Sequence, residues 1–497
     1  IRLERVHPAG HLKAAGVPIG RALVTGRLAC ALDDGHVEAG VVGDEDVLAH
    51  ERGDVRELLG PRRRVRDVPE LAISDANFGM YKEDLEKARQ IARLQDKHDW
   101  PKFIQVNGGK NQKERLMKVA SVLKGRMRVS AALQSTDEAV LKNVKRDNIS
   151  FGELKDLGSN TQKIDARADL ELILGLPGDS LATHTTSVRN GVGSGIATLR
   201  IHQLIMLPQT DMNTRETRQT FGIRTRFRLM PRSYGRYAIY GEEFDAVESE
   251  EICVATDTMS EDDYLECREL DLTIEIAHNG NVFHELAGLC RHAGIDWFDV
   301  VFGFHGKRRT LGAKLAGLYD QFREDNLSGR WETREELDAH VARHMDRYLS
   351  DTAGTNEMSK AKAMAWFKLQ NEIHRALYSE VEARLEAMPE LYERIHPFLV
   401  QLGYFSWCRK KDLLDTEERP TATFDYDFLD LMENGFEHEP SAHRADHPIE
   451  YEFRHSAYQE DLIKGYVHEF GTSIDGLGRI LMLAPVQRMF RQAYPAK

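Results

Sequence analysis

The sequence predicts an α/β fold with parallel strands in the first half of the chain, followed by a mainly α-helical region. Two observations carry this prediction. Between residues 71 and 207, short apolar segments alternate with longer amphipathic ones, and strands that alternate with helices form parallel βαβ units. From Ser260 onward, the spacing of the apolar residues is mainly helical.

The first 70 residues have an unusual composition. From Ile1 to Asn77 there is no Phe, Tyr or Trp, although aromatic residues make up 8% of the chain, and Lys13 is the only lysine. The segment is either a flexible encoded extension, and so disordered, or the product of a reading-frame error that replaced the sequence up to residue 70. Because the chain begins with Ile1 rather than Met, we expect the true N-terminus to be missing or processed.

Five short apolar segments, each followed by turn-forming residues, are predicted to be buried parallel strands. They are Leu71–Ser74, Lys102–Val106, Arg128–Leu133, Leu170–Leu174 and Leu199–Leu207. The loops that follow them are Asp75–Gly79, Asn107–Gly109, Gln134–Ser135, Gly175–Ser180 and Pro208–Asn213. Ligands bind at the carboxyl ends of the strands in such folds, so these polar and glycine-rich loops form the predicted functional face.

Helices are predicted between these strands. A charged amphipathic helix is expected over Lys82–His98, and Asn111 with Glu114 can cap the next helix. Ser135 and Glu138 fit the Ser-x-x-Glu capping box of a third helix. A fourth helix is expected after Ser180.

Five segments, in this order, resemble radical-SAM enzymes of the branch that often carries a cobalamin-binding domain. They are Ile73–Met80, Ala132–Leu141 with Lys145-Arg146, Glu171–Ser180 (which contains Gly-Leu-Pro-Gly), Gln203–Pro208 and Thr225–Arg232. The resemblance implies a partial (β/α)6 TIM-like barrel over residues 71–235, in which the five strands are the second to the sixth. It also implies that the barrel binds S-adenosylmethionine, whose sulfonium is cleaved reductively with electrons from a 4Fe–4S cluster. Cobalamin is a possible further cofactor of the intact protein.

The resemblance assigns cofactor-binding residues to the strand ends. Carried over loop by loop, they are Asp75, Asn77, Asn107, Gly108, Gln134, Ser135, Gly175, Pro177, Gln203 and Pro208. Carboxylate, amide and hydroxyl groups suit an ammonium, a carboxylate and ribose hydroxyls, and glycine allows close backbone approach. Asp75, Asn107 and Ser135 could equally be loop and helix-capping residues.

The chain departs from the family pattern upstream of Leu71. The first strand of the family is followed by Cys-x-x-x-Cys-x-x-Cys, which supplies three thiolates to the cluster. Here only Cys30 lies upstream, and the Asp-x-His-x-x-Gly motif of cobalamin domains is absent from the sequence. The reading-frame explanation of the first 70 residues is therefore slightly favoured, and the cluster ligands are missing from this chain.

The region 236–497 is expected to be mainly helical, with a short extended segment at its start. Arg226, Arg228 and Arg232 form either an ordinary basic strand face or a contact for an anionic substrate. Ser260 with Asp263 can cap the first helix, and Met358–Met388 is a long segment rich in Ala, Leu and Glu within the mainly helical region.

Histidines and one aromatic loop in this region leave alternatives open. His340 and His344, and the group His438, His443, His447 and His455, could bind metal, but solvated charged faces are the simpler explanation. The loop Phe424–Phe428 is either an interaction segment or edge packing. No metal site is predicted.

Bulk properties exclude several classes of protein. The net charge of −13 argues against a nucleic-acid binder. No apolar run approaches the roughly 18 residues of a membrane span, and no secretory signal is found, so a cytoplasmic protein is expected. Five widely spaced cysteines do not suggest a disulfide framework.

Three functions remain possible from the sequence. The first is a radical-SAM enzyme, truncated or damaged at its N-terminus, that acts on an unknown small-molecule substrate with an electron donor. The second is a degenerate module that binds S-adenosylmethionine or a nucleotide without radical chemistry. The third is an ordinary α/β enzyme with coincidental loops.

Overall fold

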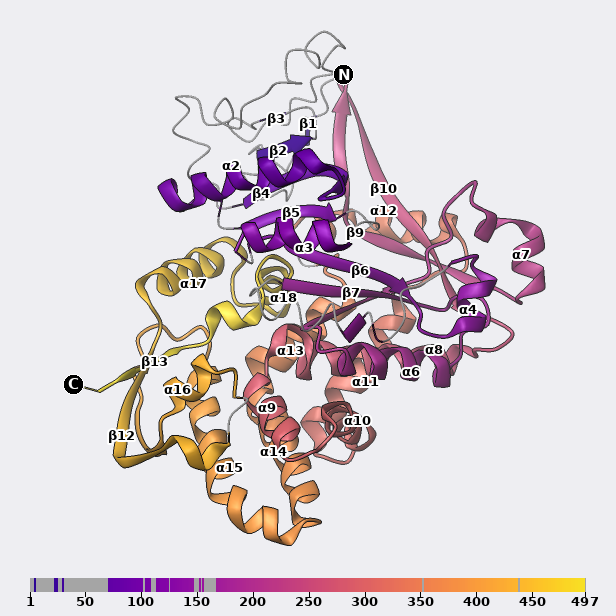
Figure 1. Ribbon diagram of the computed structural model, residues 1–497. Helices are drawn as coiled ribbons and strands as arrows, with labels where there is room; N and C mark the ends of the chain where they lie inside the picture. The colour runs from indigo at the N-terminus through magenta and orange to yellow at the C-terminus, as the bar shows by residue number, and fades with distance from the viewer. Residues whose placement is uncertain are drawn as a thin grey trace.

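A computed structural model of the chain describes residues 4–5, 22–25, 29–30, 70–101, 103–108, 113–124, 126–146, 152, 154–155, 167–350, 353–436 and 439–496. Apart from the short strands β1 (Glu4–Arg5), β2 (Ala22–Thr25) and β3 (Ala29–Cys30), the compositionally unusual first segment lies outside the described residues. In Figure 1, the first strands and helices of the α/β part are drawn in indigo to purple, and the helices of the second half run from pink through orange to yellow.

The first half of the chain alternates strands and helices, as the sequence predicts. The elements are β4 (Glu70–Phe78), α2 (Lys82–His98), β5 (Phe103–Gly108), α3 (Lys113–Val122), β6 (Arg128–Gln134), α4 (Glu138–Asn143), β7 (Arg167–Leu174), α6 (Leu181–Gly193) and β8 (Thr198–Gln203). A mixed α/β architecture with parallel strands is therefore confirmed.

The strands lie side by side in sequence order. The pairs β2–β4, β4–β5, β6–β7 and β7–β8 are parallel. A parallel bridge between Ile104 and Met127 joins β5 to β6, and the amide of Ile104 donates to the carbonyl of Arg126 at 2.8 Å. Six strands thus follow one another in one direction, and their carboxyl ends share one edge.

Helices cover one face of these strands. Leu71, Ile73 and Ile104 pack with Ala88 and Ile91 of α2 in one buried cluster. A second, larger cluster begins at Leu133 and includes Leu170, Leu172 and Leu199, residues of α6, and residues of the C-terminal helices as far as Ala493. The later strands of the α/β half therefore share a hydrophobic core with the helical region.

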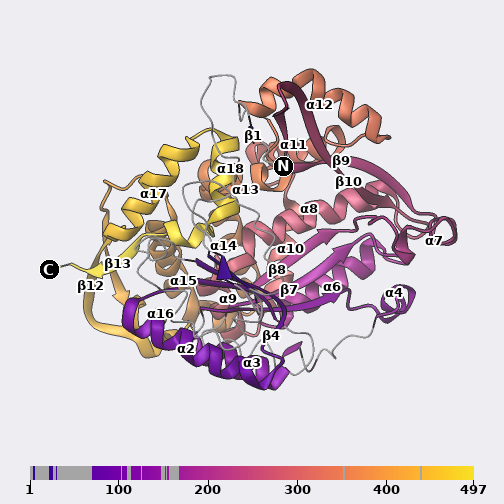
Figure 2. The same cartoon turned by 90° about the horizontal axis from the view of Figure 1, so that it is seen from above.

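In the sequence, a long antiparallel hairpin lies between the α/β half and the helical half. It consists of β9 (Arg224–Ile239) and β10 (Glu242–Ala255), preceded by the short helix α7 (Arg215–Thr220). Both views place α12 (Arg334–Leu349) beside this hairpin (Figures 1 and 2). The isolated bridge between Ile205 and Ile252 ties the chain after β8 to β10.

The remainder is mainly helical, as expected. Its helices are α8 (Glu261–Ala277), α9 (His284–His292), α10 (Trp297–Lys307), α11 (Ala313–Ser328), α12, α13 (Glu357–Lys368), α14 (Gln370–Glu386), α15 (Pro389–Lys410), α16 (Phe428–Glu433), α17 (Ala457–Phe470) and α18 (Ile474–Leu483). The strands β11 (Thr421–Tyr426), β12 (Arg444–Arg454) and β13 (Gln492–Pro495) form a small antiparallel sheet. Within the described ranges, no helix combines the length and apolar character needed to cross a membrane.

Several predictions about single elements are wrong. Asp75 and Asn77 lie inside β4, which continues past an irregularity to pair Phe78 with Gly108. By contrast, the expected helical character of Met358–Met388 is confirmed, since this segment contains two helices that meet at Leu369. Most of Phe424–Phe428 belongs to β11 or α16 rather than to a loop.

Two predicted caps have opposite outcomes. Ser260 caps α8 with Asp263 in a reciprocal capping box, as predicted. Helix α4 is capped by Asp137, whose carboxylate accepts from the amides of Ala139 and Val140, and not by Ser135. The predicted capping pair Asn111 and Glu114 cannot be compared, because Asn111 lies outside the described residues.

Candidate functional site

The candidate site begins at the carboxyl ends of β4 to β8, where the ten predicted residues lie. Asp75 is partly exposed, and its Oδ1 accepts from the amide of Asn77 at 2.8 Å. Asn107 and Gly108 end β5, and their side chains lie outside the described set. Gln134, the last residue of β6, has a φ of 69° after a register shift in the ladder.

Ser135 has a structural environment. Its side chain is 3% exposed, and its Oγ lies 3.3 Å from Oγ of Ser187 in α6. It also accepts from the amide of Asp137 at 3.1 Å. These contacts fix the turn into α4 against α6, so Ser135 orients the loop rather than facing open space.

The loop after β7 is held in shape by a buried carboxylate. Gly175 and Gly178 have φ values of 86° and 83°, a region that side chains other than glycine rarely adopt. Asp179 is 2% exposed and accepts from the amides of Gly175 (3.3 Å) and Ser180 (3.0 Å). The carbonyl of Pro177 accepts from Asn143 at 3.0 Å, which ties this loop to α4.

Burial sets the protonation behaviour of this loop. Desolvation raises the pKa of Asp179 above its usual 3.8, although His184 and the hydrogen bonds oppose the shift. Burial alone would lower the pKa of His184, but the charge and hydrogen bond of Asp271 outweigh it, so this pKa is raised. His184 Nε2 lies 2.9 Å from Asp271 Oδ1, and both side chains are 2% exposed.

The strand faces that helices do not cover also carry polar groups. Because side chains alternate along a strand and Leu170, Leu172 and Leu174 are buried, Glu171 faces the opposite side. The register pairs Glu171 with Arg200 of β8, which places both on that face. Arg200 Nε also lies 2.6 Å from Oδ2 of Asp169.

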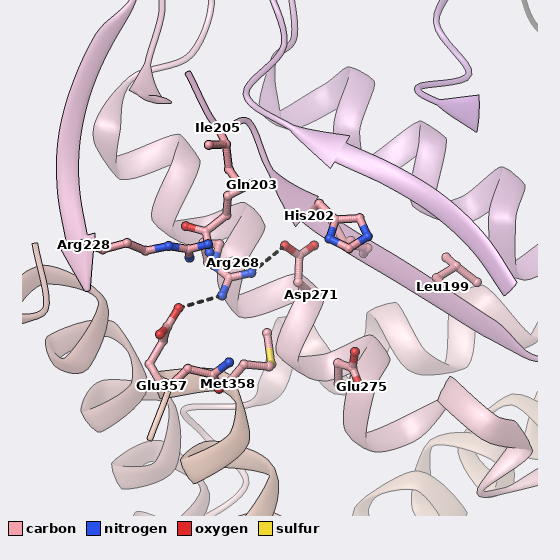
Figure 3. A pocket seen from close by; sticks show the side chains of 12 residues that line it. Leu199, His202, Gln203, Ile205, Arg228, Arg268, Asp271, Glu275, Glu357 and Met358 are labelled. Carbon is pink, nitrogen blue, oxygen red and sulfur yellow. Dashed lines mark hydrogen bonds and ion pairs between the residues drawn. The ribbon is translucent and has the colours of Figure 1, made fainter. Parts of the chain in front are cut away.

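Gln203 connects the strand ends to a cavity of about 200 Å³ (Figure 3). It is 8% exposed, and its Oε1 accepts from the hydroxyl of Tyr264. The cavity lies between the end of β8, α8 and the start of α13. Pro208, by contrast, is exposed in a turn beyond β8.

Charged side chains form a buried network along this cavity, which we call the Arg268 network: His184, Arg268, Asp271 and Glu357. Figure 3 shows Arg268 between the two carboxylates, with Nη1 at 3.4 Å from Asp271 and Nη2 at 3.1 Å from Glu357. Burial would raise the pKa of Glu357, but Arg268 and Arg228 lower it overall. The network thus places one guanidinium between two carboxylates, and Arg268, Asp271 and Glu357 line the cavity wall.

A second cavity of about 440 Å³ adjoins the first, since both are lined by Gln203, Arg228, Asn356 and Glu357. It extends toward α12 and the end of α11, and its wall includes Arg330, His340, Arg347 and Lys360. Arg228, which the sequence left between a basic strand face and a substrate contact, lines both cavities. It also pairs with Glu250, at 2.8 Å from Nη2.

Comparison with known proteins finds two methyltransferases that are similar to part of this chain. The chain is 31% identical, over 225 residues, to 2-(S-pantetheinyl)-carbapenam-3-carboxylate methyltransferase of Streptantibioticus cattleyicolor and to the cobalamin-dependent radical SAM methyltransferase TokK of Streptomyces tokunonensis. Each match covers 43% of this chain and 31% of the relative. Over these 225 residues, the chain is similar to enzymes of the cobalamin-associated branch of the radical-SAM superfamily.

The chain spans about a third of the length of these radical-SAM relatives. No family model matches. Among solved structures, the radical S-adenosylmethionine methyltransferase TsrM of Kitasatospora setae, with tryptophan and a S-adenosylmethionine analogue bound, is 13% identical with a TM-score of 0.26. That match covers 34% of this chain and 32% of TsrM.

The cysteines do not fit a radical-SAM cluster. Cys253, Cys267, Cys290 and Cys408 are buried and unpaired, and burial raises the pKa of each thiol, to about 12 for Cys253 and Cys290. A cluster needs accessible thiolates close together. The described residues contain no group of three His, Cys, Asp or Glu that could hold a metal ion.

The histidine groups do not converge on one point. The rings of His340 and His344 are 4.7 Å apart, and His340 also contacts Trp331. His443 pairs with Asp430 at 2.6 Å, and His455 pairs with the carbonyl of Met489 at 2.9 Å. His438 lies outside the described residues.

Sequence reasoning missed the Arg268 network and Asp179. Arg268 and Asp271 stand three residues apart in α8, where charged residues are spread around the whole helix. A charge at a buried helix position cannot be distinguished from an exposed one without the partner helix, because no apolar stripe marks the buried face. In the sequence, Asp179 is only one residue of the loop Gly175–Ser180, and nothing local indicates that its carboxylate is buried.

Proposed function

We propose that this chain provides the S-adenosylmethionine-binding strands and the substrate cavity of a cobalamin-dependent radical-SAM methyltransferase. The observation that carries the proposal is the set of polar and glycine-rich strand ends, β4 to β8, gathered at one edge of a chain related to two such enzymes. The substrate is a small molecule that remains unidentified, and an electron donor is required. We also propose that the protein acts in the cytoplasm.

The fold supports a finer proposal about architecture. We propose that β2 and β4 to β8 form the partial (β/α)6 barrel of the family, since they follow one another in parallel order. We retain the division into 1–70, 71–235 and 236–497 as a proposal, although residue 235 lies within β9. The helical region then forms the wall of the cavity beyond the last strand.

The donor groups at this edge suit S-adenosylmethionine. The carboxylate of Glu171 and the amide of Gln134 can bind an ammonium and ribose hydroxyls. The positive φ at Gly175 and Gly178 turns backbone groups toward the strand ends, where a ligand can approach closely. These residues bind and orient the sulfonium compound.

No step through a cluster or cobalamin is assigned to this chain. The four cysteines whose side chains the structure describes are buried, and burial raises their pKa values. The sequence contains neither the Cys-x-x-x-Cys-x-x-Cys motif nor a cobalamin motif. In the family, the cluster supplies the electron that cleaves the sulfonium. The proposal for this chain therefore concerns binding of S-adenosylmethionine and substrate.

The test is a binding measurement on the full chain. We expect S-adenosylmethionine to bind in isothermal titration calorimetry and Gly175→Ala to weaken it about tenfold. A Cβ at this positive φ costs about 1–2 kcal/mol, and the loop must leave its ligand-binding conformation to relieve that strain. Gly193→Ala in α6 is the matched control, since its added Cβ meets no atom within 4 Å. Absence of binding at millimolar concentration would overturn the proposal, provided that thermal unfolding shows a folded protein.

A further inference from the structure

The second cavity has polar walls contributed by four parts of the chain. They are β9 through Arg228, the segment after α11 through Arg330, α12 through Arg347, and the start of α13 through Thr355 and Lys360. Its volume of about 440 Å³ lies in the usual range of small-molecule sites, about 300–1,000 Å³. The cavity is therefore large enough to hold a small organic ligand.

The charge of this wall is positive although the protein carries a net charge of −13. Four basic side chains line the cavity, against the carboxylates of Asp325 and Glu357. Glu357 is already paired with Arg268, at 3.1 Å, and Arg228 is paired with Glu250, at 2.8 Å. Arg330, Arg347 and Lys360 then face the carboxylate of Asp325 in this wall, and among the described residues Lys360 has no ion-pair partner. The lining thus has an excess of positive charge.

Arg330 is held rigidly and keeps one donor unused. Its Nη2 donates to Oδ1 of Asn326 at 2.8 Å, and its guanidinium lies 4.8 Å from the centre of the Tyr264 ring. Its Nη1 is buried and has no hydrogen-bond partner among the described residues. Burial also lowers the pKa of Arg330, which indicates that its charge is incompletely compensated.

A second unused donor lies on the same wall. Thr355 is 9% exposed, and its Oγ1 has no hydrogen-bond partner in the part of the chain that the structure describes. It stands just before α13, whose first residue is Glu357 and whose N-cap is Asn356. The positive end of the helix dipole at this point also favours an anion. Buried polar groups are normally paired, so two orphans on one cavity wall indicate a ligand.

We infer that the second cavity binds an oxyanion, a carboxylate or a phosphate, carried by a small organic ligand. Arg330 and Lys360 compensate its charge, and the hydroxyl of Thr355 donates a hydrogen bond. Naming this ligand as the substrate rests on the proposed function, because the cavity adjoins Gln203 at the end of β8. The oxyanion site itself does not depend on the proposed function.

The experiment titrates the full chain with inorganic phosphate and, separately, with succinate. Two variants remove the proposed contacts: Thr355→Val, which deletes a hydroxyl that forms no bond within the described protein, and Lys360→Gln. The matched control is Lys368→Gln, an exposed lysine of the same helix outside the cavity. We expect each cavity variant to weaken binding by about five- to tenfold and the control to leave it unchanged.

The possible outcomes distinguish a carboxylate site from a phosphate site, and they test the oxyanion site separately from the proposed function. Tighter binding of succinate assigns the site to a carboxylate, and tighter binding of phosphate assigns it to a phosphate ester. No binding of either anion at 50 mM, or equal binding in all variants, overturns the oxyanion site. S-adenosylmethionine is titrated into the same samples, and its failure to bind where an oxyanion does bind would reject the proposed function alone.

Discussion

Glu285 and Lys410 form an ion pair deep in the helical region. Their side chains are 2% and 1% exposed, Glu285 Oε1 also accepts from Ser406 at 2.5 Å, and Lys410 lies 4.1 Å from the centre of the Phe283 ring. Burial raises the pKa of Glu285, but the charge of Lys410 more than offsets this, and the net pKa is about 2. Burial lowers the pKa of Lys410 to about 8.

Replacing one partner of this pair is expected to destabilise the protein. Glu285→Gln should lower the free energy of unfolding by about 3–5 kcal/mol, because it leaves an uncompensated buried ammonium. Combining it with Lys410→Met should recover much of the loss. Urea unfolding measures both, with Asp96→Asn as the control, since the exposed Asp96–Lys124 pair contributes only about 0–1 kcal/mol.

The same pair should make stability depend on pH in acid. The folded pKa of Glu285 is below its ordinary 4.5, so its contribution is complete above pH 4.5 and is lost as pH falls toward 2. The wild type should therefore lose stability over this interval, and Glu285→Gln should lose less. Parallel pH curves for the two proteins would contradict this assignment.

At the scale of single residues, the chemical type of a candidate site residue could be predicted from the sequence, but the burial of its side chain could not. Gln203 was selected from its place at a strand end, and it lines both cavities. Ser135 was assigned as a cap, yet Asp137 takes that role because Asp137 immediately precedes α4. Thr355 and Arg330 belong to no sequence motif. Their hydrogen-bond donors without a partner can be recognised only in the folded structure.

Among the elements, the β9–β10 hairpin has a turn that demands left-handed backbone. Tyr240 and Gly241 have φ values of 53° and 87°, so both central residues are left-handed, as in the type I′ turn that favours Asn-Gly. Tyr240 is 96% exposed and loses little contact area on substitution.

Substitutions at the two central positions of this turn are expected to change the stability of the protein in opposite directions. Gly241→Val should destabilise the protein by about 1–2 kcal/mol, because a β-branched residue is strained at positive φ. Tyr240→Asn should be neutral or slightly stabilising, since Asn tolerates this conformation. Thermal unfolding of both variants measures the effect, and equal shifts would contradict the assigned turn.

Periodicity located most elements in the α/β half. Helix α2 matches the predicted span Lys82–His98, because its apolar residues recur at helical spacing and the strands around it are short. The helical character of Met358–Met388 follows from its composition, but the break at Leu369 does not, because no proline or glycine marks it.

For the whole molecule, the decisive question is the iron–sulfur cluster. Anaerobic reconstitution of this chain with iron and sulfide should give no 4Fe–4S absorbance, because the four cysteines whose side chains are described are buried and their pKa values are raised. A chain extended with a Cys-x-x-x-Cys-x-x-Cys segment ahead of β4 should acquire that absorbance. Cluster formation by the present chain would show that other ligands suffice.

The α/β fold class could be predicted from alternating segments alone. The packing of the α/β half and the helical half into one hydrophobic core could not. Leu133, Leu170 and Leu199 share one buried cluster with residues as distant as Phe453 and Ala493. Such contacts link positions hundreds of residues apart, and no local period reports them. The cavities arise at this junction, so their lining could not be read from either half.

That common core has a practical meaning for anyone who prepares fragments of the protein. A clone that stops after β10 would remove Leu272, Ile276 and the other α8 residues of the cluster that holds Leu170 and Leu199. The fragment would expose these apolar strand residues to solvent, and we expect it to aggregate in inclusion bodies. Expression trials should therefore keep the helices attached, and limited proteolysis should cut at chain ends and surface turns such as Tyr240-Gly241 before it separates strands from helices.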